Sequence, residues 1–181
     1  MFNPVNPEAI GVFGLIVTVW CFGAEQLGLG IKDGSHKDIN KSLAYIAILF
    51  GGCCQVLTAI AMYFFNVTNN PELSIYLGTV FIDYGVFWIL IGVFLLNGGQ
   101  KKQIAHFFFV QFLISSVFLY KAILLGKMWP LGTVLLFICC LFIVLVPAWY
   151  EKGAAYTKLA GILNLLIGIC AVPIFLHALG L

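Results

Sequence analysis

Six long apolar runs dominate the sequence, and short polar links separate them. The runs span residues 7–28, 42–65, 73–97, 103–125, 130–150 and 156–179, each with 21 to 25 residues. About 20 apolar residues suffice for a helix to cross the hydrocarbon core of a bilayer. The runs do not alternate apolar and polar residues, as the strands of a membrane β-barrel do. The pattern therefore predicts an all-α membrane protein, with residues 1–181 forming a single domain of six transmembrane helices.

The composition also points to lipid as the solvent. Hydrophobic residues make up 62% of the chain and charged residues 9%, whereas a soluble domain is about 45–50% apolar and about 25% charged. Six spans with short links leave no room for a soluble catalytic domain. The net charge is only +2 and no arginine occurs, so we expect no nucleic-acid partner.

The cysteine and histidine residues form no metal-binding or catalytic pattern. Two adjacent cysteine pairs, Cys53–Cys54 and Cys139–Cys140, lie inside apolar runs, where buried cysteine ordinarily packs as a small apolar residue. C-x-x-C spacing is absent, and the three histidines do not cluster. The sequence contains neither a glycine-rich phosphate loop nor a Ser/His/Asp arrangement. It predicts no metal, no cofactor and no enzyme activity.

Helix starts and lysine positions give the expected topology. Asn6 and Pro7 open the first span, because Asn is a good capping residue and Pro suits the first helical position. Lysines concentrate in the links after the first, third and fifth spans and at the helix starts beside them. Seven lie on that side, namely Lys32, Lys37, Lys41, Lys101, Lys102, Lys152 and Lys158, whereas Lys121 and Lys127 lie on the other. The positive-inside rule places the first group in the cytoplasm and both termini outside the plasma membrane.

Polar side chains at membrane depth are the candidate functional residues, because each costs free energy unless it finds a partner. Asp83 and Tyr84 lie near the middle of the third span, Gln55 in the second and Asn164 in the sixth. Asp83 is either a proton or substrate relay or a neutral carboxyl that is hydrogen-bonded between helices. Gln55 and Asn164 either line a pathway or join helices by hydrogen bonds. Phe87 follows Tyr84 by three positions and shares its helix face, as an aromatic constriction or as plain packing.

Four segments together resemble a known family. Residues 6–12 read Asn-Pro-Glu-Ala-Ile-Gly-Val, and residues 50–55 read Phe-Gly-Gly-Cys-Cys-Gln. Residues 83–88 read Asp-Tyr-Gly-Val-Phe-Trp, and residues 157–161 read Thr-Lys-Leu-Ala-Gly. In this order they resemble the N-P-x-P-L-G-L, F/Y-G-G-x-x-Q, S-Y-G-x-F-W and T-K-x-G-G patterns of the acetate uptake transporter family, the succinate–acetate permeases. Ala9 and Asp83 depart from the family's Pro and Ser.

The resemblance implies a specific architecture and substrate class. It implies six helices around a pore within each protomer, a ring of six protomers, and passage of acetate and similar small monocarboxylates, with succinate an open case. The family's constriction would correspond to Leu15, Tyr84 and, by ungapped spacing back from Gly161, Ile138. The lysine bias is the reverse of the family's usual one. It matches the six-helix urea and amide channels instead, so a urea or short-amide channel is the alternative.

Electrostatics favours weak binding over a tight anion site. Arginine is the usual bidentate clamp for carboxylates, and no lysine lies at the centre of a span. Tyr84, Gln55 and Asn164 would supply hydrogen bonds, and Leu15, Ile138 and Phe87 an apolar collar. A conduction site must also release its ligand, which fits such weak contacts. Passive and proton-linked passage remain open, as does a third class, a structural membrane subunit.

Overall fold

The computed structural model describes residues 6–29, 36–65 and 70–181, and these residues form helices and short connections without a strand. The helices are α1 (Glu8–Gln26), α2 (His36–Ile46), η1 (Ala47–Cys54), α3 (Gln55–Phe65), α4 (Pro71–Asn97), α5 (Lys101–Leu124), η2 (Met128–Gly132), α6 (Thr133–Trp149) and α7 (Ala154–Ala178). Because α2, η1 and α3 are continuous, and η2 leads into α6, the described residues contain six helices long and apolar enough to cross a membrane. The all-α fold class is therefore confirmed.

The second span differs from its predicted bounds. Its helix begins at His36, whereas the apolar run begins at residue 42. Lys37 and Lys41 therefore lie on the first turns of a helix and not in a link. Hydropathy cannot detect these turns, because they are polar while the helix they open is apolar. Lys32 lies outside the described residues.

Asparagine side chains cap two helix starts, and one of them is the predicted Asn6. The side-chain Oδ1 of Asn6 accepts a hydrogen bond from the backbone N–H of Glu8 at 3.1 Å. Asn70 does the same for Leu73 at 3.3 Å, directly before Pro71 opens α4. Each contact satisfies one of the backbone donors that a helix start leaves free.

The chain divides into two compact units. The first contains Met1–Thr18, Gly34–Gly98 and Val172–Leu181, and the second contains Val19–Asp33 and Gly99–Ala171. Both α1 and α7 therefore contribute to each unit. That the chain is one domain stays a prediction.

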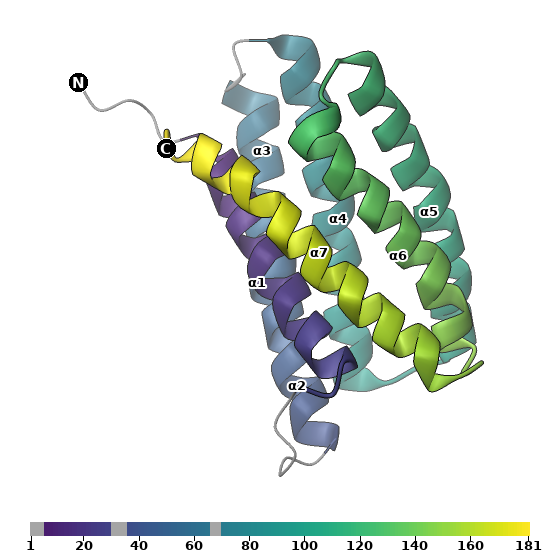
Figure 1. The fold of residues 1–181 in the computed structure, drawn as a ribbon. Helices are drawn as coiled ribbons and strands as arrows, with labels where there is room; N and C mark the ends of the chain where they lie inside the picture. The colour runs from purple at the N-terminus through teal and green to yellow at the C-terminus, as the bar shows by residue number, and fades with distance from the viewer. Residues whose placement is uncertain (1–5, 30–35, 66–69) are drawn as a thin grey trace. The chain divides into compact units, whose positions relative to one another are not determined.

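In the first unit, α4 packs along the continuous helix formed by α2, η1 and α3 (Figure 1). The end of α7 meets α1 there through Phe13 and Phe175, whose ring centroids lie 6.2 Å apart.

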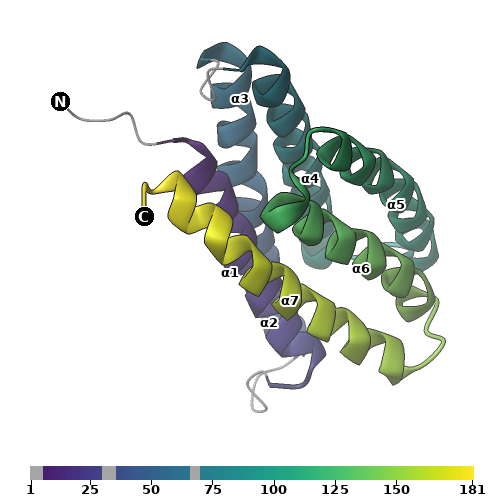
Figure 2. The same cartoon turned by 45° about the horizontal axis from the view of Figure 1, so that its top comes forward.

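In the second unit, α5 and α6 form an antiparallel pair joined through η2 (Figure 2). Phe108 of α5 packs between two aromatic side chains of α6, with ring centroids 6.2 Å from Phe142 and 5.0 Å from Trp149. The last part of α1 contacts α7 at Gly23 and Gly161, where an added Cβ on either residue would lie 3.0 Å from the other's carbonyl oxygen. These contacts hold the end of α1 against the start of α7.

Candidate functional site

A π-helical segment, η1, interrupts the second span in the first unit. It contains Gly51 and Gly52 and ends directly before Gln55, so it coincides with the Phe-Gly-Gly-Cys-Cys-Gln motif. Short π-helical insertions in α-helices occur frequently at functional sites. The sequence analysis did not predict this segment. Its only sequence signal is the glycine pair, because glycine is a weak helix former.

Two other helices approach η1 so closely that glycine is required at the contacts. A Cβ on Gly14 of α1 would lie 2.1 Å from the backbone oxygen of Phe50. A Cβ on Gly51 would lie 2.7 Å from Cγ of Trp88, on α4. A Cβ on Gly85 of α4 would lie 2.8 Å from the nearest side chain of α3. Helices α1, η1–α3 and α4 therefore converge at one level of the first unit.

Four predicted site residues lie at this level. Leu15 follows Gly14, Gln55 follows η1, Tyr84 precedes Gly85, and Phe87 packs edge-to-face on Trp88 with ring centroids 5.1 Å apart. All four are buried, with exposed fractions of 9%, 1%, 4% and 5% respectively. We call Leu15, Gln55, Tyr84 and Phe87 the η1 cluster.

Gln55 supplies an unusual polar group to the η1 cluster. Its side-chain Nε2 is buried and has no hydrogen-bond partner in the described part of the chain. A buried donor without a partner costs about 1–3 kcal/mol. An acceptor atom that reached this amide would therefore gain a hydrogen bond without first breaking one.

Asp83 lies beside the η1 cluster on α4. It is half-buried, whereas Tyr84 next to it is buried. Phe87 lies four positions after Asp83, so the two side chains share a face of α4. The structure thus brings Asp83 to the level of the cluster but on its more open side.

The second unit holds the other polar candidate, Asn164 of α7. Its Nδ2 donates a hydrogen bond to Oε1 of Gln26, at the end of α1, over 2.9 Å. Asn164 is 2% exposed, and its Oδ1 has no partner in the described part of the chain. This amide pair joins two helix ends and still leaves one acceptor atom unpaired.

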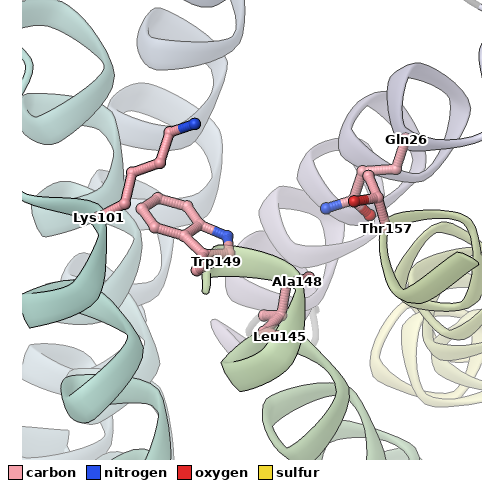
Figure 3. Close-up of a pocket in the computed structure, with 6 residues that line it drawn as sticks. All are labelled: Gln26, Lys101, Leu145, Ala148, Trp149 and Thr157. Carbon is pink, nitrogen blue, oxygen red and sulfur yellow. The ribbon is translucent and has the colours of Figure 1, made fainter. Parts of the chain in front are cut away.

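A cavity of about 180 Å³ adjoins this pair in the second unit (Figure 3). Its wall consists of residues from α1, α5, α6 and α7, namely Gln26, Lys101, Leu145, Ala148, Trp149 and Thr157. In Figure 3 Gln26 and Thr157 lie on one side, and Lys101 and Trp149 lie on the other. Amide, hydroxyl, ammonium and indole groups thus surround a space large enough for a small solute.

An exposed ion pair holds the ammonium group at this cavity. Nζ of Lys101 donates a hydrogen bond to Oε1 of Glu151 over 2.7 Å, and both side chains are largely exposed. The hydrogen bond and charge of Lys101 hold the pKa of Glu151 below its ordinary value. The carboxylate is therefore ionised at neutral pH, and the pair loses its attraction as the pH falls through this lowered pKa.

Ile138 is buried on α6, with 5% of its surface exposed. The predicted site residues thus divide between the units. Leu15, Gln55, Asp83, Tyr84 and Phe87 belong to the first, and Ile138 and Asn164 to the second.

Sequence reasoning did not select the residues around the cavity. Gln26 ends the first span, and Thr157 opens the Thr-Lys-Leu-Ala-Gly segment. Polar residues at helix ends are ordinary at the lipid headgroup level, so their position alone gives no signal. Only the hydrogen bond between Gln26 and Asn164, which lie 138 positions apart, marks them.

Comparison with protein-family models gives no match, and comparison with curated protein sequences gives none either. Among solved structures, the fold matches that of the bacterial acetate channel SatP. The TM-score is 0.79 and the sequence identity 19%, over 96% of this chain and 91% of that channel. The likeness confirms the fold that the resemblance implied. No comparison supports the urea or amide alternative.

Proposed function

We propose that this chain is a multi-pass membrane channel for acetate and related small monocarboxylates, of the acetate uptake transporter family. One observation carries the proposal. Two of the four resembled segments, residues 50–55 and 83–88, meet at the η1 cluster, where Leu15 of α1 joins them. The match to an acetate channel over nearly the whole chain supports the same conclusion.

The η1 cluster has the chemistry that brief contact with a small carboxylic acid requires. Gln55 offers an amide donor without a partner, and Tyr84 adds a phenol group. Leu15 and Phe87 supply apolar walls that disfavour hydrated ions. Without an arginine clamp the bound state stays weak, which favours fast passage. We also keep two predictions made from the sequence, that Ile138 belongs to an apolar collar and that Asn164 offers an amide to the solute.

The cavity beside Gln26 provides a second set of donors for a carboxylate. Lys101 adds an ammonium group, whose charge Glu151 balances until a carboxylate takes the place of Glu151. The indole N–H of Trp149 and the hydroxyl of Thr157 add hydrogen-bonding groups. A charged carboxylate that leaves water loses part of its hydration, and such groups replace it in part. We place an end of the pathway here.

The remaining parts of the proposal follow the resemblance. They are a pore within each protomer, a homo-hexamer in the plasma membrane, and transport that is either passive or proton-linked. Asp83 is the candidate group for a proton link. Succinate, a dicarboxylate, is the larger substrate to test.

Uptake of labelled acetate and labelled urea by the same proteoliposomes tests the proposal. We expect acetate uptake above that of empty liposomes, and urea uptake equal to theirs. Urea uptake without acetate uptake would overturn the assignment in favour of an amide channel. Uptake of neither solute would leave a structural membrane subunit as the function.

A proton gradient and a membrane potential, applied separately to the same vesicles, distinguish the two modes of transport. Transport of one proton with each acetate drives the acetate ratio set by the pH gradient, faster than in empty liposomes. A passive channel for the anion instead drives the ratio set by the membrane potential.

A further inference from the structure

A mixed basic and apolar cavity lies between α2 and α4 in the first unit, apart from the η1 cluster. Its volume is about 500 Å³, and it is lined by Lys37, Asn40, Lys41, Leu95 and Leu96. The proposed passage of acetate uses none of these residues. The question is which ligand needs both halves of the cavity.

The basic half lies on one face of α2. Lys37, Asn40 and Lys41 stand at positions i, i+3 and i+4, which are neighbours on a helix surface. Neither lysine forms an ion pair within the part of the chain that the structure describes. Asp38 is the one acidic residue of α2, so this helix start keeps a positive charge. The face therefore offers two ammonium groups and one amide to an anion.

The apolar half lies where the hydrocarbon core ends. Leu95 and Leu96 precede Asn97, the last residue of the third membrane-spanning helix. Lys37 is the first residue of the second span. Lysine at such a boundary reaches toward the headgroups while leucine stays in the acyl region. The cavity thus has its charged half at headgroup level and its apolar half at acyl-chain level.

We propose that this cavity binds one anionic phospholipid. The two ammonium groups hold its phosphate, the amide of Asn40 bonds its polar backbone, and an acyl chain lies on Leu95 and Leu96. A small carboxylate or free phosphate would use only the lysines. The lysine distribution predicts that this end faces the cytoplasm, where the leaflet carries anionic lipid. The inference depends on membrane insertion and not on the transported solute.

Native mass spectrometry of the purified protein with phosphatidylglycerol and phosphatidylethanolamine tests this site. The test variant is Lys37→Gln/Lys41→Gln, and the matched control is Lys102→Gln/Lys152→Gln, which removes the same charge from exposed residues on the same predicted side. We expect the parent to prefer phosphatidylglycerol. The test variant should lose on the order of 30-fold in that preference, about 5-fold per lysine, while the control keeps it. Elution as one symmetric peak in gel filtration shows that each variant is folded.

Three results would overturn the proposal. An unchanged preference in Lys37→Gln/Lys41→Gln would exclude these lysines as the headgroup site. An equal loss in the control variant would show a general charge effect. Displacement of the lipid by an equal concentration of glycerol 3-phosphate, which has the headgroup charge but no acyl chain, would show a small-anion site instead.

Discussion

Two buried amide side chains end in atoms without a hydrogen-bond partner in the described residues, Nε2 of Gln55 and Oδ1 of Asn164. One is a donor and the other an acceptor. Most buried polar groups in native proteins are paired, so each exception calls for a physical reason. A neutral carboxylic acid carries both an O–H donor and a carbonyl acceptor, whereas a carboxylate carries acceptors only. Nε2 of Gln55, in the first unit, therefore suits a carbonyl or carboxylate oxygen, and Oδ1 of Asn164, in the second, suits the O–H group of the protonated acid.

Replacing Gln55 with methionine should separate function from stability. Methionine keeps the length of the side chain and removes the buried amide, so the cost of about 1–3 kcal/mol for an unpaired donor disappears. We expect Gln55→Met to melt at a higher temperature than the parent in detergent and to take up acetate more slowly. Gln111→Met is the matched control, because Gln111 is equally buried but has no unpaired side-chain atom among the described residues. If Gln55→Met melts lower, its amide has a partner that stabilises the fold, and the site argument fails.

Asp83→Ser tests the second residue-scale hypothesis, a proton link at α4. Asp83 lies 12 positions after the start of α4 at Pro71, hence about 18 Å along the helix at 1.5 Å per residue. If the carboxyl exchanges protons during transport, acetate uptake by the parent should depend steeply on pH. The serine variant, which carries the family's residue, should flatten that dependence. Identical pH profiles for the two proteins would make Asp83 a structural residue.

At the scale of elements, the sequence predicts the six spans well and their internal detail poorly. Long apolar runs suffice to predict helices, because an open chain that crosses a bilayer satisfies its backbone hydrogen bonds only as a helix. The start of the second span at His36 escapes prediction, since its first turns are polar. The π-helical geometry of η1 is not predicted either, because η1 packs closely against α1 at Gly14 and against α4 at Gly51, and the sequence alone shows neither contact. Gln55, Tyr84 and Phe87 of the η1 cluster can be identified from the resembled motifs. The hydrogen bond between Gln26 and Asn164 can be found only in the folded structure.

Gly14→Ala tests whether the close approach of α1 to η1 is needed. The added methyl group would lie 2.1 Å from the backbone oxygen of Phe50, which cannot rotate away. Overpacking of this kind costs about 1–3 kcal/mol, so the variant should melt at a lower temperature. Gly78→Ala is the control, because its methyl group would meet no atom closer than 3.3 Å. Equal melting temperatures for the two variants would show that α1 shifts freely on η1.

At the scale of the whole molecule, charge is the feature that sets orientation. Seven of the nine lysines lie in the links after the first, third and fifth spans or on the helix turns beside them, and the positive-inside rule assigns this side to the cytoplasm. The expected orientation is the reverse of the one usual for the resembled family. It also decides which leaflet faces the basic cavity of α2.

A single cysteine in place of Gln100 reports this orientation. The residue lies in the short connection between α4 and α5 and is exposed. The six native cysteines are free thiols and are removed first. An impermeant thiol reagent added to intact cells should then leave the Gln100→Cys variant unlabelled. The same reagent should label it after the cells are opened. Strong labelling of intact cells would place the lysine-rich links outside.

Assembly is the last feature at this scale. Helix α5 exposes a face of large apolar side chains, Phe109, Val110, Leu113 and Val117, each with about half or more of its surface accessible. In a single protomer only lipid would cover this face. Close van der Waals packing drives helix association in membranes, so a second copy is a suitable cover.

We expect native mass spectrometry in mild detergent to give a closed ring of about six times 19.9 kDa. Replacing Val117 with tryptophan should weaken the ring if α5 lies at the contact, whereas Leu136→Trp on α6 should not. A stable monomer for the parent protein would show that lipid covers this face, and would exclude the ring.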